Sequence, residues 1–271
     1  MMVCKMNEVS LSVSSSPGSQ ATPCAQPFSA AELLRVWERG RRESPVEQGL
    51  LMLASACPGT PRESLAELSI GRRDACLLDL REKLFGPELS SLADCPGCGE
   101  RLEMNFRVSD IRVTSEPESE PLSIKLSGYD LSFRLPNSLD LLALTARASV
   151  AEMRGKLFER CLLGVRRPGH ARSASQPIPE LPAKVIDLAI ARMSEADMQA
   201  DVRLNLTCPC CERRWKATFD IVSYLWSELQ EQVTRLLREI HVIASAYGWR
   251  EAEILALSPW RRQCYLEMLT G

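Results

Sequence analysis

The chain has 271 residues, of which 45% are hydrophobic and 25% charged, as in soluble globular proteins with a sizeable core. Its formal net charge of −2 argues against bulk nucleic-acid binding, which usually needs a basic face. We find no secretory signal and no stretch of about 18 apolar residues, so we expect a cytoplasmic protein that does not span a membrane. Its eleven cysteines then favour bound metal over disulfides.

The first third of the sequence predicts an arm followed by helices. Residues 1–28 are rich in serine and proline, which predicts a disordered arm. An N-terminal helical region should cover 29–94, beginning where Ser29 can cap a helix whose third residue is Glu32. Further helices are expected over Pro45–Cys57, Ser64–Leu68 and Ile70–Phe85.

The helix expected over Ile70–Phe85 carries acidic residues beside arginines. This pattern usually indicates a solvated helix face with ion pairs between side chains. The residues that we expect on such a face are Arg72, Arg73, Asp74, Asp79, Arg81 and Glu82.

Two short cysteine pairs, Cys95-Pro-Gly-Cys98 and Cys208-Pro-Cys-Cys211, are the strongest chemical signal in the chain. Each is followed by an alternating, strand-like run, Arg101–Val108 after the first and Arg214–Ile221 after the second. A further strand-like run, Val202–Leu206, precedes the second pair. Two such turns brought together place four thiolates in a tetrahedron, the geometry that Zn²⁺ adopts in closed structural sites. The sequence therefore predicts a structural zinc site formed by Cys95, Cys98, Cys208 and Cys211.

A zinc site is not the sole interpretation that the cysteine pairs allow. The two pairs could be unconnected or free of metal, and a redox dithiol or an iron–sulfur cluster is less favoured. Cys210 occupies the variable position of the second pair, where we expect an exposed thiol rather than a ligand. Gly99 follows the first pair and Glu212 follows the second. A positive φ at this position would strain only the glutamate.

Because the four cysteines would connect residue 95 to residue 211, we expect 95–221 to form a split zinc ribbon in which 99–207 is inserted. After the strand-like run that ends at Val108, the insertion contains an acidic loop over 109–121 and a basic, proline-rich loop over 166–182. Alternation predicts a β-hairpin of Leu122–Leu126 and Gly128–Leu135, with its turn at Ser127 and Gly128. Helices are expected over Leu139–Ala148, Val150–Cys161 and Pro182–Met193.

A C-terminal helical region should cover 222–271. Its long helix, Val222–Tyr247, ends at Gly248, and helices over Glu251–Ala256 and Pro259–Leu269 follow. Trp260, Arg261 and Arg262 could belong to a nucleic-acid-binding helix, but the mixed charges of this tail favour a protein–protein surface. The fold class that we predict is α+β, mostly helical, with a split Cys4 zinc ribbon and a small β-hairpin insertion.

We find no sequence motif of a catalytic site. The chain contains only two histidines, His170 in the proline-rich loop and His241 on the long C-terminal helix, and no glycine-rich phosphate loop. Four thiolates would also leave a zinc ion no open position for a substrate or water. We therefore expect a protein that is not an enzyme and has no catalytic residues.

Taken together, segments spread over roughly residues 35–271 resemble a known family. These segments are Ser44–Leu50, Ile70–Ala75, Leu84–Pro87, Cys95–Gly99, Tyr129–Pro136, Asp197–Val202, Cys208–Cys211, Phe219–Ile221 and Tyr247–Leu257. In them the sequence resembles baseplate-associated proteins of T4-like phage tails and phage-derived contractile injection systems, the T4-type baseplate hub assembly chaperone family.

The resemblance implies a non-enzymatic baseplate component or hub assembly factor of a contractile phage-tail-like particle. Its partners would be baseplate, hub or spike proteins, with neither nucleic acid nor membrane, and it could remain cytoplasmic or enter the particle. The alternative is a zinc-ribbon nucleic-acid-binding regulator that uses the ribbon and the last helices. The acidic charge balance counts against this alternative.

Overall fold

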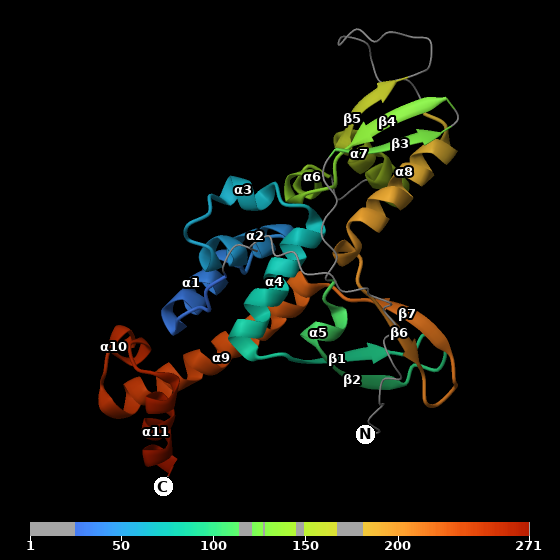
Figure 1. The fold of residues 1–271 in the computed structure, drawn as a ribbon. Helices are drawn as coiled ribbons and strands as arrows, with labels where there is room; N and C mark the ends of the chain where they lie inside the picture. Colours follow the sequence, from blue (N-terminus) through green and yellow to red (C-terminus); the bar gives the residue numbers. More distant parts are fainter. Residues whose placement is uncertain (1–24, 114–120, 127, 145–148, 167–180, 271) are drawn as a thin grey trace.

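The computed structural model describes residues 25–113, 121–126, 128–144, 149–166 and 181–270 (Figure 1). The fold is α+β and mostly helical, as predicted, and its strands form three small antiparallel sheets. Most of the predicted disordered arm, residues 1–24, lies outside the described residues. Ala25, however, is buried, and the backbone N–H of Gln26 donates to the carbonyl oxygen of Ala56 at 2.8 Å. The packed body of the protein therefore includes residues before Ser29.

A helical body packs around α9, the long helix over Ile221–Tyr247 (Figure 1). The helices that precede the first sheet are α1 (Ala30–Gly40), α2 (Pro45–Ala56), α3 (Arg62–Ala66) and α4 (Ile70–Phe85). Their starts follow the capping rule, since the hydroxyl groups of Ser29, Ser44 and Ser69 accept hydrogen bonds from the first turns of α1, α2 and α4. Three of these helices, α1, α2 and α4, contact α9 directly.

One hydrophobic core joins the two ends of the sequence. It includes Leu53 of α2, Leu77 of α4 and Leu229 of α9, all fully buried. Gly40 permits the close approach of α1 to α9, because a Cβ at this position would lie 2.5 Å from the ring of Trp226. The helical regions predicted over 29–94 and 222–271 therefore share a single core.

Two β-hairpins lie side by side at one end of this body (Figure 1). Strands β1 (Glu88–Asp94) and β2 (Arg101–Arg107) form the first, and β6 (Arg203–Thr207) and β7 (Arg214–Thr218) form the second. The strands expected next to both cysteine pairs are confirmed. Strand β1 was not predicted. Because it pairs with β2, the first cysteine pair, like the second, lies at the tip of a hairpin. After β2 the chain enters a short helix, α5 (Val108–Ile111), where a loop was expected.

The segment between the hairpins builds a module with its own core. Its sheet has the order β3 (Leu122–Leu126), β4 (Tyr129–Phe133) and β5 (Leu162–Arg166). Helices α7 (Val150–Cys161) and α8 (Ala183–Ala196) pack on one face of this sheet, burying Leu131, Phe133 and Phe158.

The structure corrects two expectations for this module. The expected hairpin with Gly128 in its turn is present, with φ of 76° at that glycine, but β5 adds a third strand. Helix α6 (Ser138–Leu142) is one short turn, whereas a helix to Ala148 was expected; residues 145–148 lie outside the described residues. The acidic and basic loops fall largely on residues 114–120 and 167–180, which are also outside them.

The N-terminus of α4 is where the module meets the helical body. The backbone N–H of Ile70 donates to the carbonyl oxygen of Pro136 at 3.0 Å, on the segment between β4 and α6. The N–H of Gly71 donates to Asp197 Oδ2 at 2.9 Å, just before the 3-10 turn η1 (Met198–Ala200) that leads to β6. Both ends of the module are thus fixed to the same helix start.

The charged residues of α4 do not form the solvated face that we expected. Arg73, Asp74 and Arg81 are buried, because α4 packs between other elements of the body, although Arg72 and Glu82 are exposed. Arg81 Nη2 contacts Glu228 Oε1 of α9 at 2.7 Å. Burial raises the pKa of Asp74 to about 6, although Arg73 Nη2, 2.8 Å from its Oδ1, acts to lower it.

The last helices fold back on the end of α9. Gly248, with φ of 68°, ends α9, and α10 (Glu251–Leu255) and α11 (Pro259–Thr270) follow. Arg262 is buried, and its Nε donates to Glu239 Oε2 of α9 at 2.9 Å. This arginine therefore stabilises the packing of α11, and it is not part of an exposed basic patch with Arg261.

Candidate metal centre

The two cysteine turns are built alike. At the tip of β1–β2, the N–H of Cys95 donates to the carbonyl oxygen of Glu100, and the N–H of Gly99 donates to that of Cys95, at 2.8 and 2.9 Å. At the tip of β6–β7, Cys208 takes the place of Cys95, with corresponding hydrogen bonds at 2.9 and 3.0 Å. Each hairpin therefore presents its two thiols from the same local backbone geometry.

A left-handed residue closes each turn. Gly99 has φ of 75° and Glu212 has φ of 57°, and Glu212 is the one non-glycine residue with positive φ in the described ranges. Both turns therefore meet the condition considered from the sequence, under which Glu212 is strained and Gly99 is not. The left-handed conformation destabilises a residue with a side chain by roughly 1–2 kcal/mol. Glu212 adopts this strained conformation where it closes the turn that holds Cys208 and Cys211.

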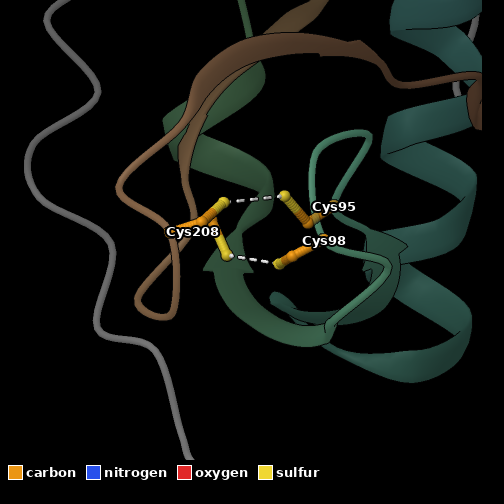
Figure 2. Close-up of side chains that lie close together, drawn as sticks. Cys95, Cys98 and Cys208 are labelled. Carbon is orange, nitrogen blue, oxygen red and sulfur yellow. Dashed lines mark hydrogen bonds between the residues drawn. The ribbon is translucent and has the colours of Figure 1, made fainter.

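The four predicted cysteines meet between the two hairpin tips. All four Sγ atoms lie within 4.8 Å of one another. The shortest recorded contacts cross from one hairpin to the other, Cys95 Sγ to Cys211 Sγ at 3.6 Å and Cys98 Sγ to Cys208 Sγ at 3.5 Å (Figure 2). Residues more than a hundred positions apart in the sequence are brought together here.

The cluster is half enclosed by the protein. Cys95 and Cys208 are buried, whereas Cys98 and Cys211 are exposed. Leu102 of β2 and Trp215 of β7 pack beside the two buried cysteines and form a small separate hydrophobic cluster. Cys210 is exposed and outside the group of four, as predicted.

The pKa values of the two thiols of the first turn shift in opposite directions. Burial acts to raise the pKa of Cys95, but hydrogen bonds from the backbone of its turn and from the Cys208 and Cys211 thiols lower it to about 6. For Cys98, a backbone hydrogen bond at Glu100 acts to lower the pKa, but the contacts with the other thiols raise it to about 12. The contacts around these two thiols therefore favour the thiolate at Cys95 and the neutral thiol at Cys98.

The chemistry of this group is that of metal binding. The four possible ligands are all sulfur atoms and come from two hydrogen-bonded turns, so they could hold one metal ion with four bonds. Of the two histidines, His241 is exposed on α9, far along the chain from the cysteines, and His170 lies outside the described residues.

Sequence reasoning identified all four cysteines of the group. It did not identify Trp215, which packs beside the buried cysteines, because nothing in the Cys-Pro-x-Cys motif marks a residue after it as a contact of the other hairpin. The alternation of apolar residues after the second pair is the signal that could have assigned Trp215 to the inner face of β7.

A comparison with models of known protein families identifies the family of this chain. Residues 30–226 match the model of the family described as T4 bacteriophage base plate protein. The chain belongs to this family. The match covers most of the sequence and includes both hairpins, the module between them and the first part of α9. The resemblance to T4-like baseplate proteins is thereby confirmed. No curated protein and no solved structure shows significant similarity to this base plate protein.

Two further findings concern the base plate protein as a whole. In the described ranges, no helix is both long and apolar enough to cross a membrane. The family match ends at residue 226, near the start of α9, so most of α9 together with α10 and α11 lies beyond it.

Proposed function

We propose that the protein is a non-enzymatic baseplate component or baseplate hub assembly factor of a contractile phage-tail-like particle. The observation that carries this proposal is the match to the T4 base plate family over residues 30–226. Its partners are other baseplate, hub or spike proteins, and it works in the cytoplasm of the producing cell, from which it can enter the particle. It uses neither nucleic acid nor membrane.

The four cysteines, in this proposal, bind one structural Zn²⁺. Zinc–sulfur bonds of about 2.3 Å in a regular tetrahedron separate the sulfurs by about 3.8 Å. The distances of 3.6 Å between Cys95 and Cys211 and 3.5 Å between Cys98 and Cys208 are close to this value. Four thiolates complete the coordination, so the ion stabilises the protein rather than activating a substrate.

The zinc ion would connect two hairpins that the sequence separates widely. We propose that 95–221 forms a split zinc ribbon and that 99–207 is inserted between its two cysteine pairs. The separate core built from residues between Leu122 and Met193 supports an insertion, whereas Phe106 and Leu204 on either side of it belong to the core of the helical body. Metal binding and folding should be coupled, because both hairpins contribute ligands to one ion.

The C-terminal helical region offers a surface for partners. Trp260 and Met268 of α11 are 75% and 70% exposed, although both are large apolar side chains. Their spacing of eight residues places them on the same side of the helix. Exposed tryptophan is enriched among residues that contribute most to protein–protein binding. We propose that this side of α11 contacts another baseplate protein.

A deletion strain tests the proposal. Without the gene, electron microscopy should show no assembled baseplates, and the wild-type gene should restore them. Trp260→Ala should restore them poorly, although the purified variant melts like the wild type. Mass spectrometry of purified particles distinguishes a baseplate component from an assembly factor. The protein should be detected in the particles if it is a component and should be absent from them if it is an assembly factor. Normal particles from the deletion strain would overturn the proposal.

A further inference from the structure

One arginine reaches from the second hairpin to the first beside the cysteine cluster. Arg213 directly follows the second cysteine turn. A Cβ added to Gly97 would lie 2.8 Å from Arg213 Cδ, 3.6 Å from its Nη1 and 3.4 Å from Cys211 Sγ. The Arg213 side chain therefore lies against the turn of the first pair, and Cys211 Sγ approaches the same glycine.

The contact lies where the two turns differ in sequence. Both read Cys-Pro-x-Cys, with Gly97 in the first and Cys210 in the second. Gly97 has no side chain, and the space that a side chain would need is filled by Arg213. Cys210 is exposed, so its position accepts a side chain. A side chain at position 97 would therefore require Arg213 to move.

The charge of the arginine suits this position. A zinc ion with four thiolates carries a net double negative charge, and two of the thiolates here, Cys98 and Cys211, are exposed to solvent. The other charged groups of the two tips are Glu100, Arg101, Glu212 and Arg214, and of these Arg101 pairs with Asp94 at 3.1 Å. Among the described residues, no carboxylate forms an ion pair with Arg213.

We propose that Arg213 is a positioning residue of the metal centre. Its aliphatic stem holds the turn of the first pair against the second, and its guanidinium group balances part of the negative charge on the sulfurs. Together these contacts slow the loss of the metal ion. The inference rests on the proposed zinc site, and it adds a residue that does not bind the metal itself. Residues that support metal ligands commonly change metal affinity by about 10- to 100-fold.

Zinc transfer from the full-length protein to a colorimetric chelator tests this role. Arg213→Gln should release zinc about ten times faster than the wild type, and Arg213→Lys, which keeps the charge, should restore part of the difference. Gly97→Ala should resemble Arg213→Gln, because its Cβ displaces the arginine. The matched control is Arg214→Gln, an exposed neighbour on β7, which should release zinc at the wild-type rate.

The dependence on salt separates charge from packing. Raising the salt concentration should speed zinc release from the wild type more than from Arg213→Gln, because salt screens the guanidinium charge. Wild-type release rates in both Arg213 variants would overturn the role of Arg213 and leave the zinc site standing. A wild-type protein that binds no zinc would overturn the site, and the role of Arg213 with it.

Discussion

Asp140 is a buried carboxylate that connects three parts of the inserted module. Its side chain is fully buried, yet it accepts hydrogen bonds from Arg134 Nη1 at 2.5 Å, Arg134 Nη2 at 2.8 Å and Arg160 Nε at 3.0 Å. The backbone N–H of Asn137 adds a fourth at 3.1 Å. These contacts join the end of β4, the start of α6 and the end of α7. Replacement of Asp140 by Asn removes the charge with little change in volume.

The expected loss of stability follows from these contacts. The Asn amide group would face hydrogen-bond donors on Arg134 or Arg160, so at least one charge-assisted hydrogen bond becomes a contact between two donors. Breaking a buried ion pair by removing one partner destabilises proteins by about 3–5 kcal/mol. Because the side chains of Arg134 and Arg160 are 27% and 44% exposed, water can solvate them, and we expect a loss near the lower end, about 3 kcal/mol.

The effect should depend on pH. Burial acts to raise the pKa of Asp140, but the Arg134 and Arg160 hydrogen bonds and the Asn137 N–H outweigh it and lower the pKa below 3.8. The stabilisation is therefore present above pH 3.8 and decreases as the pH falls through the folded-state pKa. The gap between wild type and Asp140→Asn should narrow in acid.

Urea unfolding followed by circular dichroism measures this gap. Asp187→Asn is the matched control, because Asp187 pairs with Arg154 where both side chains are more than half exposed. Asp187→Asn should lower the free energy of unfolding by less than about 1 kcal/mol. If Asp140→Asn unfolds within 1 kcal/mol of the wild type at pH 7, the buried ion pairs do not stabilise the module and the reasoning is wrong.

Three smaller changes test other parts of the structure. Glu212→Gly should raise the free energy of unfolding by about 0.5 kcal/mol, since relief of the left-handed conformation exceeds the added entropy of the unfolded chain; a lower melting temperature would contradict this. Burial raises the pKa of Asp74 to about 6, so the free energy of unfolding of the wild type should fall by about 3 kcal/mol relative to Asp74→Asn as the pH rises from 3.8 to 6. Parallel curves of unfolding free energy against pH for the two proteins would refute this. Gly71→Ala should cost about 1–3 kcal/mol in thermal melts, because its Cβ would overlap the Asp197 carboxylate, whereas Gly155→Ala, with open space around it, should be neutral or stabilising.

The local signals in the sequence predicted much of the fold and the candidate site. Ser29 and Glu32 marked the start of α1 correctly, because a capping box is decided within four residues. The matching flanks of the two cysteine pairs were enough to predict that Cys95 and Cys211 lie close together. Ligands of one metal ion must be neighbours in space, however far apart they are in the chain. Comparing the two turns identified the position after each pair as one where a positive φ would strain Glu212, and the structure has a positive φ there.

What was missed depends on tertiary contacts. Strand β1 has two adjacent serines and weak alternation, and it is a strand because β2 offers it a partner. Strand β5 is five residues long and completes a sheet whose other strands lie far before it in sequence. The burial of Arg73 and Arg81 is decided by the helices packed around α4, so their spacing on one helix could not reveal it.

The central claim is that four cysteines from two distant turns bind one zinc ion. Native mass spectrometry of the protein from zinc-supplemented cells tests it most directly. The account predicts one zinc ion per chain, lost when Cys98 and Cys211 are both replaced by serine and kept when Cys210 is replaced. A wild-type chain with the mass of the metal-free protein, or a double variant that keeps its zinc, would contradict the account.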